Sequence, residues 1–129
     1  MKHNTKVIGN TGEEYAVDYL KRNRYEIVGR NYRKRFGEID IIAERDGTYI
    51  FVEVKTRHCN PLTRPSEAVD RRKQEKIIRT AYSYIYENHL EANYRFDVCE
   101  VFVEQDTLKL VSLNYFENAF AVEGDYGYF

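Results

Sequence analysis

The clearest pattern in the chain is a pair of β-rich runs separated by a two-residue turn. Residues 38–44 and 49–55 are rich in isoleucine, valine and aromatic residues, and Asp46-Gly47 lies between them. Asp-Gly favours a type I′ turn, because both central residues of that turn need positive φ. We therefore predict an antiparallel hairpin in which the numbers of paired residues sum to 93.

Two helices are predicted on either side of this hairpin. Thr11 and Glu14 fit a capping box, so the first helix is expected to begin there and to run to about Asn23. Apolar residues then recur at helical spacing and predict a long helix from Ser66 or Asp70 to Asn88. These apolar residues are Val69, Ile77, Ala81 and Ile85.

The remaining segments complete the predicted fold. We expect a short strand at residues 25–28 that breaks at Gly29, a mobile loop at 56–65, and strands at 96–103 and 108–113. The order α-β-β-β-α-β-β predicts the α/β class, with a mixed β-sheet flanked by α-helices. Residues 1–120 are expected to form one domain, and residues 121–129 a loosely ordered tail.

Composition limits the classes of protein to consider. With 129 residues, 43% of them apolar and only two prolines, the chain should form one folded domain. Residues 1–6 are polar and no apolar run is long enough for a membrane span, so we expect neither export nor membrane insertion. Cys59 and Cys99 lack metal-ligand and disulfide spacing, which favours free thiols and a cytoplasmic location.

The chemistry lies on one face of the predicted hairpin. Register and side-chain alternation make one face apolar, with Ile39 opposite Val54, and place Asp40 opposite Glu53 on the other. Glu38 would face Lys55. At ~5 Å and an effective dielectric of ~20, two carboxylates repel by about 3 kcal/mol. A Mg²⁺ or Mn²⁺ ion would offset that repulsion, and the alternative is a solvated, screened sheet face.

Two further charged residues lie at positions where an apolar side chain would be expected. Glu13 precedes Ala16, Val17 and Leu20 at helical spacing, so it belongs to the stripe that faces the core. The alternative for Glu13 is a partly exposed residue that interacts with the helix dipole. Lys73 lies between Val69 and Ile77 on the second helix, where its stem could also extend past the apolar stripe to water.

Together these residues suggest metal-assisted hydrolysis of a phosphodiester bond. Asp40 and Glu53 would be metal ligands, Glu13 a third acidic ligand or a residue that positions water, and Lys55 would stabilise charge in the transition state. The sequence contains no glycine-rich phosphate loop, nucleophile elbow or dinucleotide fingerprint that would indicate other chemistry.

The sequence also resembles a known family. Asp40 followed by Glu53-Val54-Lys55 is similar to the PD-(D/E)xK nuclease site. More closely, several motifs in order resemble the YraN-like family of uncharacterised bacterial predicted endonucleases, over roughly residues 9–120. These motifs are Gly12-Glu13-x-x-Ala16, Asn31-x-Arg33, residues 37–43, residues 51–57, Glu67-Ala68-Val69 with Lys73, and Arg95-Phe96-Asp97-Val98.

The resemblance implies a restriction-endonuclease-like fold, akin to that of archaeal Holliday-junction resolvases. It implies a metal-dependent endonuclease that acts on nucleic acid, with DNA favoured over RNA and branched or junction DNA among the candidate substrates. Glu13 would correspond to the first-helix glutamate of those resolvases. The chain departs from the motif at Ile39, where the pattern has proline. Since many nucleases of this kind cut two strands as pairs, a homodimer is also expected.

The distribution of charge fits a polyanionic substrate. Residues 1–85 carry 18 basic and 12 acidic side chains and residues 86–129 carry 2 and 9, so charges of +6 and −7 give the net −1. Basic clusters occur at residues 21–24, 30–35 and 71–79, and solvated helix faces are the alternative explanation. The predicted nucleic-acid contacts are Arg33, Lys34, Arg35, Arg57, Arg72 and Lys73. A module on the same fold that binds nucleic acid or forms a complex without cleavage is the rival hypothesis.

Overall fold

The computed structural model describes residues 3–58 and 69–121. It contains the seven predicted elements in the predicted order, which confirms the α/β class. They are α1 (Thr5–Arg22), β1 (Glu26–Lys34), β2 (Gly37–Arg45), β3 (Thr48–His58), α2 (Arg71–Glu87), β4 (Asn93–Val103) and β5 (Leu110–Phe120). The strands form one sheet in the order β1-β2-β3-β4-β5. It is mixed, because β3 and β4 are parallel and the other neighbours are antiparallel.

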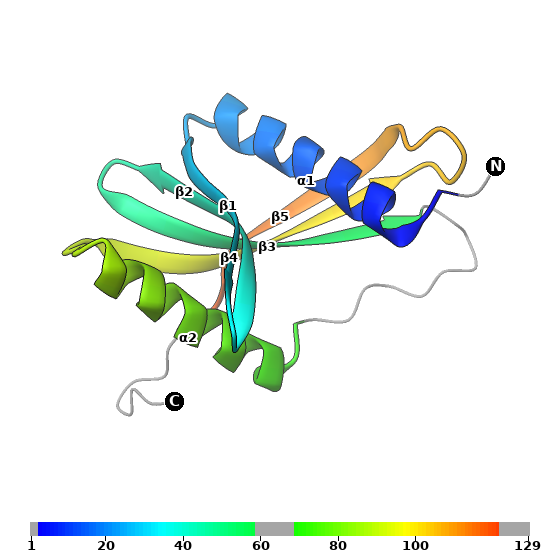
Figure 1. The fold of residues 1–129 in the computed structure, drawn as a ribbon. Coiled ribbons are helices and arrows are strands. Elements are labelled where there is room, and N and C mark those ends of the chain that lie inside the picture. The colour runs from blue at the N-terminus through cyan, green and yellow to red at the C-terminus, as the bar shows by residue number, and fades with distance from the viewer. Residues whose placement is uncertain (1–2, 59–68, 122–129) are drawn as a thin grey trace.

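The two helices cover opposite faces of the sheet, as Figure 1 shows. One core cluster joins Ala16, Val17 and Leu20 of α1 to residues that include Ile41 and Val52 of the sheet. The other joins α2 to the opposite face, where Phe51, Phe96 and Phe120 stack in sequence. β3 is therefore covered on both sides, which explains why its sequence reads as a nearly continuous apolar run.

The central hairpin forms as predicted. Ile41 pairs with Val52, Ile42 with Phe51 and Ala43 with Ile50, so the paired numbers sum to 93. Asp46 and Gly47 have φ of 51° and 81°, as a type I′ turn requires.

The predicted start of the first helix was wrong. α1 begins at Thr5 because the Asn4 side chain caps it, accepting a hydrogen bond from the Val7 amide at 2.8 Å. Thr11 therefore lies inside the helix, and its hydroxyl donates to the Val7 carbonyl instead of capping. Its end at Arg22 and the start of α2 after the Asp70 cap agree with the sequence prediction.

The strands β1, β4 and β5 are longer than predicted. β1 continues through Gly29, where the register with β2 shifts, and absorbs most of the basic stretch. β4 begins at Asn93, and β5 begins at Leu110 instead of residue 108 and runs to Phe120, because strands paired to a long neighbour persist through polar residues. Residues 56–58 of the predicted loop belong to β3, whereas residues 59–68 and 122–129 lie outside the described residues. No helix within the described ranges is long and apolar enough to cross a membrane.

Candidate active site

The site lies where β2 and β3 part. The ladder between these strands ends at the pair Ile41–Val52, so Asp40 and Glu53 occupy the first positions beyond it. There the Asp40 carboxylate accepts a hydrogen bond from the Val54 amide at 2.8 Å. It takes the place that a backbone carbonyl of β2 would have in a continuing ladder. β3 continues alongside β4 through His58 while β2 continues alongside β1, and an opening remains between them.

The two acidic side chains are close enough to affect each other's ionisation. Burial, followed by repulsion from Glu53, raises the pKa of Asp40 from 3.8 to about 8, and Glu13 adds to this effect. The Glu53 side chain is only 6% exposed, and its Oε2 atom lies 2.5 Å from Nζ of Lys73. Burial lowers the pKa of Lys73, but the contact with Glu53 outweighs it, and the pKa is raised overall.

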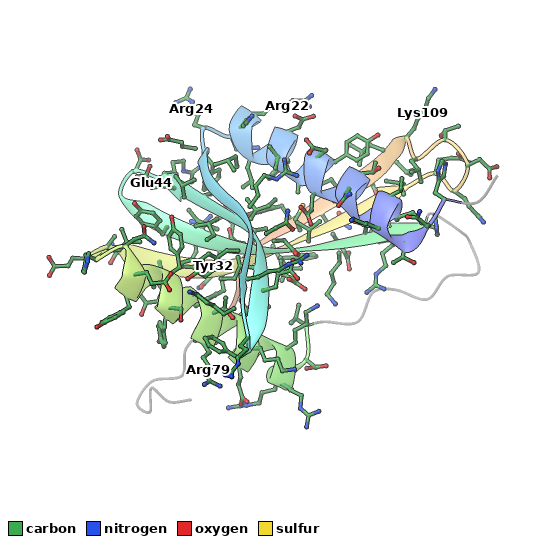
Figure 2. All side chains as sticks on the ribbon, viewed as in Figure 1. Arg22, Arg24, Tyr32, Glu44, Arg79 and Lys109 are labelled. Atoms are coloured by element: carbon green, nitrogen blue, oxygen red, sulfur yellow. The ribbon has the colours of Figure 1, made fainter. Side chains whose placement is uncertain are left out.

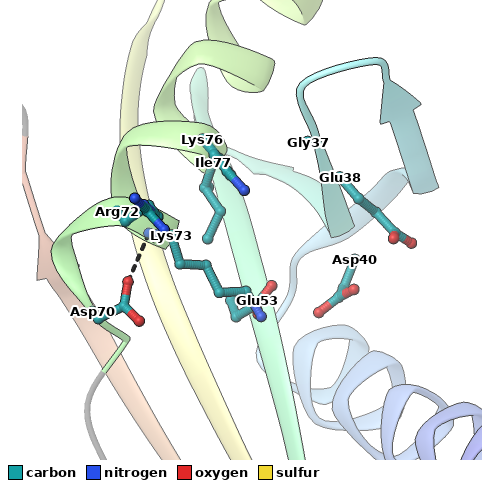
Figure 3. Close-up of a pocket in the computed structure, with 9 residues that line it drawn as sticks. All are labelled: Gly37, Glu38, Asp40, Glu53, Asp70, Arg72, Lys73, Lys76 and Ile77. Carbon is teal, nitrogen blue, oxygen red and sulfur yellow. Dashed lines mark hydrogen bonds and ion pairs between the residues drawn. The ribbon is translucent and has the colours of Figure 1, made fainter.

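A pocket of about 360 Å³ opens over these groups. In Figure 3 the carboxylates of Glu38, Asp40 and Glu53 lie on the β2 and β3 side, and Lys73 extends toward Glu53 from α2. The lining residues are Gly37, Glu38, Asp40, Glu53, Asp70, Arg72, Lys73, Lys76 and Ile77. A phosphate that enters this pocket would therefore meet basic side chains from α2 and acidic side chains from the sheet.

Glu13 reaches the region from α1. Its side chain is 14% exposed, and burial raises its pKa while Arg30, 3.6 Å away, lowers it in part. The neighbouring Glu14 is not a capping residue; it forms an exposed ion pair with Arg30 at 2.9 Å. A Cβ on Gly12 would lie 1.7 Å from Oγ1 of Thr56, so glycine is required for α1 to approach β3 this closely.

Lys55 follows Glu53 by two residues on β3. Side chains two apart on a strand share a face, so Lys55 and Arg57 point to the same side of the sheet as Glu53. Both are half-buried. Lys55 is not among the residues that line the pocket. The structure thus brings Asp40, Glu53 and Lys73 together, with Lys55 adjacent along the strand.

Two predicted details of the hairpin were wrong. Glu38 does not face Lys55, because the β2–β3 ladder stops before reaching them, and Glu38 pairs instead with Arg33 of β1 at 3.3 Å. Ile39 does not join Ile41 on the apolar face, but packs in the cluster under α2. Beyond the last β2–β3 pair the two strands separate, so their shared alternation no longer holds.

The predicted basic residues separate into three groups. Arg72 and Lys73 line the pocket, and Arg35 lines an adjoining groove with Arg72. Lys34 is paired with Glu87, and Arg33 with Glu38. The cluster at residues 21–24 lies elsewhere: Arg22 and Arg24 project at the far end of α1, at the top of Figure 2, while Arg79 lies at the bottom.

Sequence reasoning assigned no site role to Lys76, Asp70 or Arg30. The sequence indicated Lys76 only as part of the basic cluster at residues 71–79, and Asp70 only as a possible start of the second helix. Both line the pocket because the first two turns of α2 lie over the start of β2. Arg30 was also seen as cluster charge, yet it bridges Glu13 and Glu14. No signal in the sequence links β1 to the first helix at this point.

The donor atoms fit a hard divalent cation better than a softer metal. Asp40 and Glu53 offer carboxylate oxygens, and Mg²⁺ commonly uses one or two carboxylates with water and substrate oxygens completing its shell. Burial and then repulsion from Glu53 raise the pKa of Asp40, and Lys73 pairs with Glu53, so the negative charge of both carboxylates is offset in this structure by a proton or by an ammonium group. Across residues 3–58 and 69–121, no three histidine, cysteine or acidic side chains form a ready-made metal cluster.

Comparison with known proteins places the chain in a family. Residues 12–101 match the family model described as Uncharacterised protein family UPF0102. A UPF0102 protein of Alkaliphilus oremlandii is 48% identical over 118 residues, covering 89% of this chain and 98% of its own. One from Caldanaerobacter subterraneus is 42% identical over 120 residues, covering 92% and 98%. One from Chlorobium phaeobacteroides is 41% identical over 127 residues, covering 95% and 100%.

Proposed function

This chain belongs to the UPF0102 family, the YraN-like group that its motifs resemble, and from the geometry of its site we propose a metal-dependent endonuclease. The observation that carries the proposal is the pair of carboxylates, Asp40 and Glu53, held together at the point where β2 and β3 part. Holding two ionised carboxylates this close in a buried place is costly, and a bound divalent cation would offset that cost more fully than the pairing of Glu53 with Lys73 does.

Each residue has a distinct part in the proposed reaction. Asp40 and Glu53 would hold Mg²⁺ or Mn²⁺, which when bound polarises a phosphoryl oxygen and lowers the pKa of water. Lys55, next to them on β3, would stabilise the negative charge that builds up on the phosphate during attack. Glu13 would orient the attacking water or complete the acidic ligand set from α1.

Lys73 has a separate role in this proposal. Its ammonium group neutralises Glu53 in the structure described here. When a cation takes over that neutralisation, Lys73 would be released to contact the substrate phosphate, together with Arg72 from the same helix turn. The basic side chains of α2 favour a polyanionic substrate, and we propose that this substrate is DNA. We also propose a cytoplasmic location.

A cleavage assay tests this proposal. Purified protein is incubated with labelled single-stranded, duplex and four-way-junction DNA in Mg²⁺ or Mn²⁺. We expect cleavage that stops in EDTA and falls by several orders of magnitude in Asp40→Asn. The matched control is Asp46→Asn, which changes the same residue type in the hairpin turn, where asparagine also accepts a φ of 51°. Unchanged cleavage by Asp40→Asn would contradict the assignment of Asp40 to the active site.

One observation favours a second candidate, a module that binds nucleic acid without cutting it. Lys73 already satisfies Glu53, so the site can be neutralised without a cation. In that case DNA binding would be retained in EDTA, no divalent ion would bind in calorimetry, and no cleavage would occur with any of the three substrates.

A further inference from the structure

A second hollow adjoins the candidate active site. It has a volume of about 600 Å³, within the ~300–1,000 Å³ range of sites that hold a small ligand group such as a nucleotide. One side is formed by the turn between β1 and β2, which carries Arg35 and Phe36, and the other by α2. Arg72 and Lys76 line both hollows, so the two adjoin each other at these side chains. We call this second hollow the α2 groove.

Close packing holds the two sides of the α2 groove in place. A Cβ on Gly37 would lie 2.6 Å from Oγ1 of Thr80 and 3.0 Å from the Lys76 carbonyl oxygen, so the start of β2 rests directly on α2. The Arg79 guanidinium lies over the Phe36 ring, 4.3 Å from its centre. The two sides of the groove are therefore held in place by packing, and the Arg79 guanidinium and the Phe36 ring stack within it.

The α2 groove carries an excess of positive charge. Arg35, Arg72 and Lys76 line it, and within the described part of the chain none of them has a carboxylate partner. Among the described residues that line the groove, Glu75 is the one acidic side chain, and it forms an exposed ion pair with Arg71 at 3.8 Å. The charge is placed to attract phosphate groups that approach the active site.

Aromatic side chains add a second kind of recognition. Tyr82 lines the α2 groove, and 40% of the residue is exposed. The Tyr82 ring packs edge to face against the ring of Tyr94 on β4, with 6.1 Å between the ring centres, so β4 supports its position. Rings and guanidinium planes of this kind bind the flat faces of bases, and these faces are accessible only when the base is not stacked in a duplex.

We propose that the α2 groove binds an unpaired nucleotide beside the bond that is cut, so that the substrate is a nucleic acid with a single-stranded segment. Phosphates would contact Arg72 and Lys76 at the entrance to the active site. The adjoining base would stack on the exposed ring of Tyr82, since the Phe36 ring is already covered by the Arg79 guanidinium. This inference rests on the proposed nuclease function for its statement about the cut bond.

Binding without cleavage tests the groove directly. Fluorescence anisotropy is measured in EDTA with a labelled single strand and with a blunt duplex of the same sequence. Tyr82→Ala should weaken binding of the single strand by about tenfold and leave the duplex little changed. Tyr86→Ala is the control, because Tyr86 lies on the same helix, is 81% exposed and does not line the α2 groove. Tyr82→Phe keeps the ring and should bind as the unchanged protein does.

A second measurement uses the unchanged protein and so does not depend on the folding of a variant. A strand made wholly of abasic sites keeps the phosphates and removes the bases, and it should bind several-fold more weakly than the normal strand. Equal binding of the two strands, or an equal effect of Tyr82→Ala on strand and duplex, would overturn the inference.

The outcomes separate this inference from the proposed function. If the protein cleaves DNA but Tyr82→Ala binds the single strand normally, the groove assignment fails and the nuclease proposal stands. If Tyr82 governs binding of the single strand but no cleavage occurs in Mg²⁺ or Mn²⁺, the groove is supported as a binding site and the nuclease proposal fails.

Discussion

Asp40 makes the stability of the protein depend on pH. Because its pKa is raised from 3.8 to about 8, the folded chain binds a proton between about pH 4 and pH 8 that the unfolded chain has released. Stability therefore falls as the pH rises through this range, by at most about 1.4 kcal/mol per pH unit for one proton. Below pH 4 both states are protonated, and the contribution is constant.

Asp40→Asn should remove this dependence. We expect the variant to match the unchanged protein near pH 4 and to exceed its free energy of unfolding at pH 8. Urea denaturation at pH 4, 6 and 8 in EDTA measures the difference, with Asp46→Asn as the control. The same pH slope in Asp40→Asn would show that Asp40 is not the group that titrates.

A second buried acid is structural. Asp97 is fully buried and accepts hydrogen bonds from Arg95, from the Tyr115 hydroxyl at 2.6 Å and from the Asn118 amide at 2.8 Å. It lies at the register shift between β4 and β5, so its carboxylate replaces missing ladder bonds. In the sequence Asp97 appeared only within the Arg95-Phe96-Asp97-Val98 motif, with no sign of its structural role, because its partners on β5 are about 20 residues away.

Asp97→Ala should cost about 3–5 kcal/mol in the free energy of unfolding, since it leaves Arg95 and two donors without their acceptor. Chemical denaturation measures this, and Asp106→Ala is the control, because Asp106 is exposed. A loss below 1 kcal/mol would mean that water replaces the carboxylate without penalty.

At the scale of elements, the position of Glu13 depends on how closely α1 approaches β3. Gly12→Ala would place a Cβ 1.7 Å from Oγ1 of Thr56, and we expect a destabilisation of about 1–3 kcal/mol or more. Gly9→Ala is the matched control. Nothing lies within 4 Å of a Cβ there, so the same substitution in the same helix should stabilise by about 0.5–1 kcal/mol.

Thermal denaturation of both variants distinguishes a clash from a general effect on the helix. Thr56→Ala combined with Gly12→Ala should recover part of the loss, because the clashing Oγ1 atom is gone. If Gly12→Ala and Gly9→Ala change the melting temperature in the same direction, close packing of α1 on β3 is not the reason for glycine at residue 12.

Local signals predicted the elements well and their ends less well. The Asp46-Gly47 turn set the register of the hairpin up to the pair Ile41–Val52. Asp40 and Glu53 follow that pair and line the same pocket, close enough to interact. The pattern did not show that the β2–β3 ladder ends at Ile41, because this depends on β3 pairing with β4 beyond that point. The early start of α1 was missed because Thr11 and Glu14 match a capping box further along the chain, whereas the residue that caps the helix is Asn4.

At the scale of the whole molecule, the basic side chains are not equivalent. The cluster at the far end of α1 is separate from the pocket, whereas Arg72 lines both the pocket and the α2 groove. If α2 contacts the phosphates, Arg72→Ala should reduce the slope of log binding constant against log salt by about 0.7–0.9. Arg22→Ala should leave the slope unchanged.

Anisotropy titrations in EDTA at several salt concentrations between about 50 and 200 mM measure this slope for both variants. Equal slopes for Arg72→Ala and Arg22→Ala would indicate that nucleic acid is attracted by overall charge and has no defined path across α2.

The central claim is that Asp40 and Glu53 form a site for a divalent cation. A crystal structure from crystals grown with Mn²⁺, with an anomalous difference map recorded above the manganese edge, tests it most directly. We predict a peak within coordination distance of both carboxylates, with Lys73 displaced from Glu53. A map without a peak at saturating Mn²⁺, with Lys73 still paired to Glu53, would contradict the account.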